Sequence, residues 1–319
     1  MPDLKEVYFQ TLRIRKIEEA IAERYSEQKM RCPTHLSIGQ ELVPVAISQY
    51  LTTRDKAYSS HRAHAHYLAK GGDLSKLIAE LHGKSGGCTA GRGGSMHLSD
   101  LDCGFIASTA IVGNSIPLAT GNALHQQLSQ SDGITISYFG DGATEEGAFY
   151  ESLNFATVRS LPILYACENN QYSVYSPLSV RQPASRSIAK LAAEIGVKSF
   201  SVDGNDPQRV LEASQAAIEF IRKERKPALV EYFTYRHREH CGPNFDDELN
   251  YREAHEVEEW LANDPLKNLQ KLLSSDSDFS HFQARVSEQI TQEIEAAFNF
   301  ASSSPFGDPI DNERYIYAK

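Results

Sequence analysis

The chain has 319 residues, of which 23% are charged and 41% hydrophobic, and its formal net charge at pH 7 is −10. This acidic balance argues against binding to nucleic acid or to an anionic membrane surface, because both favour a basic protein surface. The sequence has no apolar leader and no run of about 18 apolar residues, which argues against export and membrane spanning. Its five cysteines are scattered, without a C-x-x-C pair, as is typical of reduced thiols. We therefore expect a globular cytoplasmic protein.

The amino-terminal region is predicted to be helical. Apolar residues recur at helical spacing through residues 3–29, which indicates an amphipathic helix used for packing or subunit contact. A turn that contains His35 then leads into a second helix over residues 41–50. His35 on its own fits a buried polar residue as well as a site residue.

Residues 59–67 hold three closely spaced histidines, His61, His64 and His66. They do not have the H-E-x-x-H spacing, and no cysteine or carboxylate nearby completes a zinc site. A loop that binds phosphate fits better, because Arg62 carries a planar guanidinium suited to oxyanions.

Residues 83–97 are rich in glycine but match neither common nucleotide-binding loop. Ile78 stands where a Walker loop ending at Gly83-Lys84-Ser85 requires a glycine, and no G-x-G-x-x-G follows a strand. Nucleotide and nicotinamide cofactors are therefore disfavoured. The glycines suit a flexible loop that closes over a ligand.

The central stretch, residues 134–176, is predicted to be a β-α-β unit. A β-branched and aromatic run ends at Gly140-Asp141-Gly142, and a helical pattern follows with Glu145 and Glu146 in its first turn. A short apolar run, residues 162–167, then returns as a parallel strand and ends at Asn169-Asn170.

This topology places Asp141 and Asn170 side by side at the carboxyl edge of the sheet, where open α/β sheets bind ligands. A carboxylate and a carboxamide offer hard oxygen ligands to Mg²⁺, which usually completes its octahedron with phosphate oxygens and water. The stretch therefore predicts a Mg²⁺-diphosphate site.

The remaining pattern extends the same sheet. A strand, a helix and a strand are expected over residues 197–202, 206–224 and 228–235, and the last strand carries His240 to the same edge. That histidine suits phosphate binding or proton transfer, although a solvated charged turn is the alternative. We predict an α/β fold with a mostly parallel sheet, helices on both faces and helical extensions at both ends. The expected divisions are a helical extension (1–50), an α/β domain (51–243) and a helical tail (244–319).

Taken together, several motifs resemble the alpha subunit of the thiamine-diphosphate-dependent decarboxylating component of 2-oxo-acid dehydrogenase complexes, of the pyruvate and acetoin dehydrogenase type. The motifs span roughly residues 5–260, and their number makes the resemblance specific. They are His35-Leu-x-x-Gly39-Gln40-Glu41, Arg62-x-His64, Gly91-Arg-Gly-Gly-Ser-Met-His97, Ile111-Val-Gly113 with Ile116-Pro117, and Gly140-Asp141-Gly142 followed by Asn169-Asn170.

The resemblance implies a role for each matching residue. Mg²⁺ would be held by the side chains of Asp141 and Asn170 and by the backbone carbonyl of Tyr172. The diphosphate would contact Arg62, His240 and the backbone N–H groups of Gly142 and Ala143. The Val112 backbone would hold the aminopyrimidine of thiamine diphosphate, and His35, like His240 a candidate catalytic residue, would lie beside the reactive carbon of the cofactor.

The resemblance also implies partners. A beta subunit would supply the activating glutamate in an α₂β₂ heterotetramer, the substrate would be a small 2-oxo acid or acetoin, and a lipoyl acyltransferase would accept the acyl group. Some positions depart from the family pattern. His61 replaces a common tyrosine, Ala65 a common glycine, and Arg238-Glu239-His240-Cys241 a common His-Gly-His-Ser. These changes leave open a non-lipoyl acceptor such as an aldehyde or sugar. A subunit without catalytic activity is a separate alternative, against which the intact Asp141, Asn170 and Arg62 argue.

Overall fold

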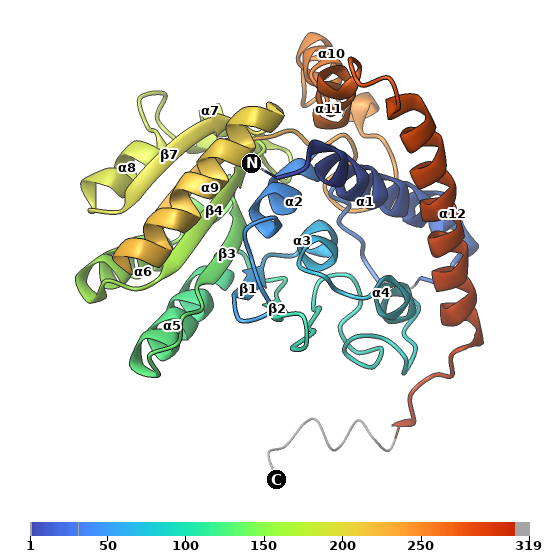
Figure 1. Ribbon diagram of the computed structural model, residues 1–319, viewed down its shortest axis with the longest axis horizontal. Coiled ribbons are helices and arrows are strands. Elements are labelled where there is room, and N and C mark those ends of the chain that lie inside the picture. Colours follow the sequence, from blue (N-terminus) through green and yellow to red (C-terminus); the bar gives the residue numbers. More distant parts are fainter. Residues whose placement is uncertain (1, 31, 310–319) are drawn as a thin grey trace.

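A six-stranded parallel sheet forms the centre of the part of the chain that the computed structural model describes, residues 2–30 and 32–309 (Figure 1). The strand order is β2-β1-β3-β4-β8-β7, and every neighbouring pair is parallel. The strands are β1 (Lys56–Ser59), β2 (Phe105–Ser108), β3 (Thr135–Gly140), β4 (Ile163–Asn169), β7 (Lys198–Asp203) and β8 (Ala228–Phe233). A small antiparallel pair, β5 (Tyr172–Ser173) and β6 (Ser176–Pro177), lies outside this sheet.

Helices connect the strands and extend the chain at both ends. Their bounds are α1 (Leu4–Arg24), α2 (Leu42–Ser48), α3 (His64–Ala69), α4 (Leu74–Leu81), α5 (Ser115–Leu128), α6 (Gly147–Arg159), α7 (Leu178–Arg181), α8 (Ile188–Glu194), α9 (Pro207–Glu224), α10 (Ala254–Ala262), α11 (Pro265–Leu273) and α12 (Phe279–Ser303). Three short 3₁₀ helices are η1 (Tyr25–Glu27), η2 (Asp141–Glu145) and η3 (Asp247–Leu249). In the described part, no helix is both long and apolar enough to cross a membrane.

Alternating side chains of the strands divide the core into two layers. In β4, Leu164 and Ala166 pack on the face covered by α2 and α9, whereas Tyr165 and Cys167 pack on the face covered by α5, α6 and α8. This alternation follows from the two-residue repeat of a strand. An apolar strand buried on both faces is typical of parallel sheets, and the predicted α/β fold with helices on both faces is confirmed.

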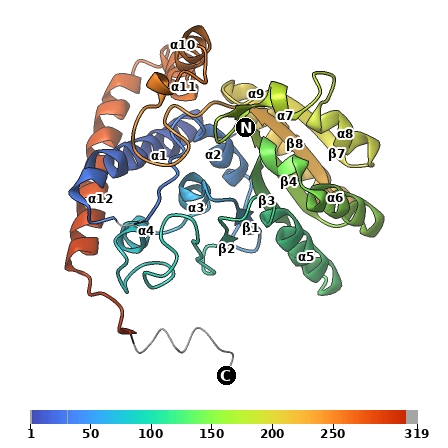
Figure 2. The same ribbon diagram turned by 180° about the vertical axis from the view of Figure 1, so that it is seen from behind.

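The helical ends of the chain pack against each other. The long helix α12 runs beside α1 and α4 along one edge of the molecule, as both views show (Figures 1 and 2). Tyr8 of α1 meets Phe279 edge to face with ring centroids 5.1 Å apart, and Arg13 forms a bidentate pair with Glu293. The last ten residues of the predicted tail, 310–319, lie outside the described residues.

The central unit forms as predicted, except where its helix begins. The β3–α6–β4 topology places the ends of β3 and β4 side by side, with Gly140 opposite Glu168. Residues Asp141–Glu145 form the 3₁₀ helix η2, and α6 starts only at Gly147 after an extended Glu146. The placing of Glu145 and Glu146 in the first turn of the helix was therefore wrong. A hydrogen bond from the Thr144 hydroxyl to the Asp141 carbonyl, 2.7 Å long, stabilises the tighter turn.

The glycine-rich loop wraps around a buried carboxylate of the chain itself. Glu80, at the end of α4, accepts backbone N–H groups from Thr89, Gly91, Gly93 and Gly94 at 2.7–3.2 Å. Gly91 and Gly94 have φ angles of +78° and +58°, which glycine adopts without a Cβ clash. The expected flexible loop is therefore anchored, because its N–H groups form an anion-binding concavity that Glu80 fills.

We expect Glu80→Gln to destabilise the chain by about 3 kcal/mol, because several charge-assisted hydrogen bonds to a buried group weaken together. Urea unfolding measures the loss, and hydrogen exchange at residues 89–94 locates it. Glu212→Gln on the exposed side of α9 is the matched control. Unchanged exchange in the loop would show that Glu80 does not hold it.

Candidate functional site

A cavity of about 180 Å³ lies at the carboxyl ends of β1, β2, β3, β4 and β8. Every residue that the sequence predicts for the site lines it. They are His35, Arg62, Val112, Asp141, Gly142, Ala143, Asn170, Tyr172 and His240. The segments that carry them are far apart in the sequence, and parallel strands bring them to one edge because all their carboxyl ends point the same way.

Asp141 lines this cavity directly after β3, with 1% of its surface exposed. Its carboxylate forms an ion pair with Arg181, the last residue of α7. Burial raises the pKa of Asp141, because the charged form loses hydration, and the Arg181 guanidinium acts in the opposite direction. A buried, ion-paired carboxylate at this position can bind a cation.

Asn170 and Tyr172 follow the neighbouring strand β4. The side-chain oxygen of Asn170 accepts the Tyr172 N–H at 3.2 Å, and its amide group donates to Gln40 at 3.4 Å. The Tyr172 hydroxyl donates to Glu256 of α10 at 2.9 Å. Tyr172 therefore lines the cavity and also connects this loop to the carboxy-terminal helices.

Arg62 follows β1 and is buried beside the cavity. Its guanidinium donates to the carbonyls of Leu36 at 2.5 Å and His240 at 3.2 Å. Burial lowers the pKa of Arg62 to about 10, and the nearby Arg236 acts in the same direction. Both hydrogen-bond acceptors are neutral carbonyls, so the charge of the guanidinium is not neutralised by these bonds. Arg62 therefore supplies positive charge for an anionic ligand.

Three imidazoles gather at one end of the cavity. The ring centroids of His35 lie 4.6 Å from His61 and 5.1 Å from His240, and the last two are 5.3 Å apart. Burial lowers the pKa of His35 to about 2, of His61 to about 4 and of His240 to about 3, and Arg62 adds to each effect. The three rings are therefore neutral near pH 7 and can each donate or accept one hydrogen bond.

The sequence did not reveal this grouping, because the neighbours of His61 in sequence point elsewhere. His64 pairs with Glu18 at 2.7 Å, and His66 contacts Ser59 at 2.7 Å and Glu168 at 3.1 Å. A zinc site made of His61, His64 and His66 is therefore excluded. His35 lines the cavity together with His61 and His240.

The loops after β2 and β3 contribute Val112, Gly142 and Ala143 to the cavity lining. Val112 is 47% exposed and Ile111 65% exposed, although both are apolar. At Gly142 an added Cβ would lie 2.9 Å from the Ser173 hydroxyl oxygen, so only glycine fits this turn without a shift. The apolar side chains of Ile111 and Val112 are thus uncovered in a loop that lines the cavity.

Gln40, Glu168 and Arg181 also belong to the site but were not predicted for it. Gln40 donates to Thr234 at 3.0 Å and accepts from Asn170, so it joins the loops after β4 and β8. Glu168 lines the cavity with one buried carboxylate oxygen that has no hydrogen-bond partner. Gln40 belongs to the motif His35-Leu-x-x-Gly39-Gln40-Glu41, and Glu168 directly precedes Asn169-Asn170. These positions could have indicated both residues, whereas nothing local marked Arg181.

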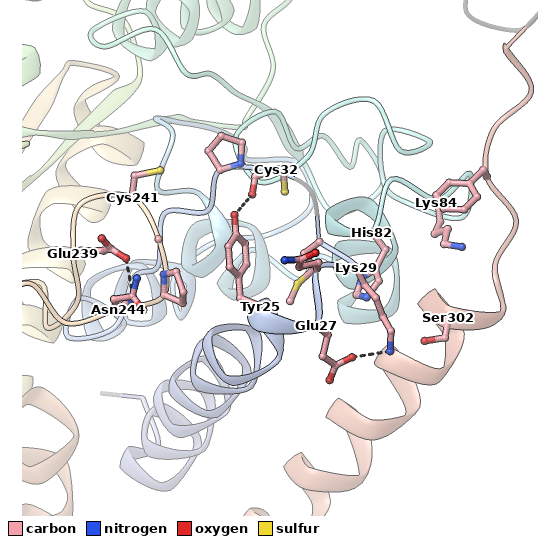
Figure 3. Close-up of a pocket in the computed structure, with 16 residues that line it drawn as sticks. Tyr25, Glu27, Lys29, Cys32, His82, Lys84, Glu239, Cys241, Asn244 and Ser302 are labelled. Carbon is pink, nitrogen blue, oxygen red and sulfur yellow. Dashed lines mark hydrogen bonds and ion pairs between the residues drawn. The ribbon is translucent and has the colours of Figure 1, made fainter.

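A second, larger cavity of about 1340 Å³ lies on the outer side of the loop that carries His240 (Figure 3). His240 lines the inner cavity, whereas its neighbours Glu239 and Cys241 line the outer one. Among the residues that line it, Figure 3 shows the hydrogen bonds from Tyr25 to the Cys32 carbonyl and from the Asn244 N–H to Glu239. The loop thus separates the two cavities, and the inner one is lined by the residues predicted for the site.

The inner cavity fits a hard cation together with a phosphorylated ligand. Asp141 and Asn170 provide the oxygen ligands that Mg²⁺ prefers, and Arg62 supplies a positive charge for phosphate. The buried Nδ1 of His35 and Oε1 of Glu168 have no partner within the described chain. Buried polar atoms usually have partners, so both are suited to a ligand that enters the cavity.

Comparisons with known proteins agree with this arrangement. The family model described as "Dehydrogenase E1 component" matches residues 10–310. The chain is 35% identical over 308 residues to the alpha subunit of acetoin:2,6-dichlorophenolindophenol oxidoreductase from Bacillus subtilis (strain 168), covering 96% of this chain and 90% of that protein. It is 33% identical over 318 residues to the pyruvate dehydrogenase E1 component subunit alpha of Rickettsia conorii, covering 98% and 96%. The subunit of the same name from Porphyra purpurea is 35% identical over 316 residues, covering 95% and 90%.

Proposed function

Because the chain belongs to the dehydrogenase E1 component family, we propose that it is the alpha subunit of a thiamine-diphosphate-dependent dehydrogenase acting on a 2-oxo acid or on acetoin. The enzyme would cleave its substrate and transfer the acyl group to lipoamide. The observation that carries this proposal is the single cavity that brings Asp141, Asn170 and Arg62 together at the sheet edge.

The residues of the cavity have distinct roles in this proposal. Asp141, Asn170 and the Tyr172 carbonyl would hold Mg²⁺. The diphosphate would be bound by Arg62, His240 and the N–H groups of Gly142 and Ala143. The Val112 backbone would position the aminopyrimidine. When bound, thiamine diphosphate supplies the carbanion and the electron acceptor that the cleavage requires.

His35 and His240 would act at the substrate end of the cavity. Both imidazoles are neutral near pH 7, so each can donate one hydrogen bond to a substrate oxygen and accept another. Closing the cavity from water would strengthen these contacts.

The uncovered apolar rim supports a partner subunit. Ile111 and Val112 lie beside the cavity and are exposed, although both are apolar. Exposed apolar side chains next to a site are typical of a surface that another subunit covers. A beta subunit, in an α₂β₂ assembly in the cytoplasm, would cover them and supply the activating glutamate. A lipoyl acyltransferase would be the further partner.

The test uses the chain purified together with the beta subunit. Acetoin and small 2-oxo acids are assayed with thiamine diphosphate, Mg²⁺ and a lipoylated acceptor, with reduction of 2,6-dichlorophenolindophenol as a parallel readout of substrate oxidation. We expect one substrate to give acyl-lipoamide. Substrate cleavage without any acyl-lipoamide would contradict the lipoyl acceptor, and absence of cofactor binding would contradict the whole proposal.

A further inference from the structure

Arg181 occupies the carboxylate that the proposed function assigns to the metal. Its guanidinium pairs with both Asp141 and Glu145, and its Nε donates to the Ser176 carbonyl at 3.0 Å. All three guanidinium nitrogens are thus bonded, and the side chain is 9% exposed. The arginine is therefore held in one position against Asp141, which lines the cavity.

The segment around Arg181 clamps the turn that carries Asp141. Gln182 donates to the Thr144 hydroxyl at 3.3 Å and to Glu145 at 3.0 Å, and Arg186 donates to the Thr144 carbonyl at 2.7 Å. Residues 176–186 are therefore hydrogen-bonded to η2 at several points, but within this segment only Arg181 contacts the buried carboxylate of Asp141.

Arg181 bonds to Oδ2 of Asp141, so a divalent cation on the same carboxylate, even on Oδ1, would lie close to the guanidinium. The two positive charges would repel each other strongly, because the interior screens charges less than water does. We propose that Arg181 competes with Mg²⁺ for Asp141, so that metal binding displaces the guanidinium from Asp141 while Glu145 retains it. This inference rests on the proposed function. Glu145 is partly exposed and does not line the cavity, so a metal bound in the cavity does not compete for it. Its ion pair with Arg181 can therefore persist.

Two consequences follow from this competition. The affinity for the metal is lower than the oxygen ligands alone would give, because each binding event breaks an existing ion pair. Metal binding also removes one of the contacts between residues 176–186 and η2, so it loosens that segment. Arg181 acts through Asp141 and is a positioning residue of the metal site.

The test measures metal affinity in the full chain with its beta subunit, at saturating thiamine diphosphate. Mn²⁺ binding is followed by electron paramagnetic resonance and Mg²⁺ binding by calorimetry. We expect Arg181→Met to bind both ions about 10-fold more tightly, since hydrogen bonds to charged groups are worth this much. Arg181→Lys keeps the charge but not the planar guanidinium, so its metal affinity is expected to lie between those of the wild type and Arg181→Met.

Arg186→Met is the matched control, because Arg186 grips the same turn without touching Asp141. It is expected to change metal affinity less than about two-fold. If Arg186→Met increased the metal affinity equally, the cause would be the loss of contacts between residues 176–186 and η2. That result would overturn the competition. Unchanged or weaker metal binding by Arg181→Met would overturn it as well.

The outcomes separate this inference from the proposed function. If the wild-type complex binds neither ion with thiamine diphosphate, the proposed function fails and the competition fails with it. If the wild type binds but Arg181→Met is not tighter, only the competition fails. If Arg181→Met does not fold, the metal affinity of Arg181→Lys is measured instead. Tighter metal binding by Arg181→Lys would still require competition for Asp141.

Discussion

Asp141→Asn is expected to weaken binding of thiamine diphosphate with Mg²⁺ by roughly 100-fold or more and to remove activity accordingly. The substitution keeps the shape of the side chain but removes the negative charge that neutralises the cation. It also leaves Arg181 with Glu145 as its only carboxylate partner. Calorimetry on the complex with the beta subunit measures the loss, and steady-state kinetics measures the activity.

The matched control for this change is Asp203→Asn. Asp203 ends strand β7 at the same edge of the sheet, but it is exposed and does not line the cavity. Its substitution should leave cofactor affinity unchanged. Undiminished cofactor binding by Asp141→Asn would mean that the cation is held by other groups, and the assignment of Asp141 would be withdrawn.

Acidification below pH 6.5 is expected to destabilise the chain steeply. The pKa of His35 is lowered to about 2, that of His240 to about 3 and that of His61 to about 4, from an ordinary value of 6.5. Between these values and pH 6.5 the unfolded chain binds protons that the folded chain does not, so stability is fully present above pH 6.5 and falls as the pH falls.

Each histidine contributes at most about 1.4 kcal/mol per pH unit, so the three together reach at most about 4 kcal/mol per unit. Asp141 and Glu41 act in the opposite direction, because burial raises their pKa values. Urea unfolding of the full chain at about pH 7.5, 6.5 and 5.5 gives the slope.

His35→Gln should flatten this slope by about 1 kcal/mol per pH unit. The exposed His281 on α12 provides the control, His281→Gln, which should leave the slope as it is. An unchanged slope in His35→Gln would show that the imidazole of His35 is not held neutral by burial.

Several features followed from the sequence because they depend on local pattern and simple topology. Two-residue and helical repeats placed four of the six sheet strands, β3, β4, β7 and β8, and several helices, whereas β1 and β2 were not predicted. The resemblance to alpha subunits of the E1 component is confirmed. The chain is accordingly a subunit of an oxidoreductase. Asp141 and Asn170 could be placed together because one helix joins adjacent parallel strands, whose carboxyl ends must then be neighbours. The roles of the individual site residues and the division into three parts stay predictions.

Other features were decided by tertiary contacts between segments distant in sequence. His61 joins His35 and His240 rather than His64, because Glu18 of α1 takes the ring of His64. Glu80 fills the glycine-rich loop, which no repeat in the sequence could indicate.

The tertiary structure adds one feature to the predicted Mg²⁺-diphosphate site. The sequence determined that a carboxylate and a carboxamide meet at the edge of a parallel sheet, because the order of strand, helix and strand leaves them no other position. Only the folded chain brings Arg181, forty residues after Asp141, onto that carboxylate. The physical reason is that a buried charge needs a partner, and the nearest available one comes from whichever segment packs there.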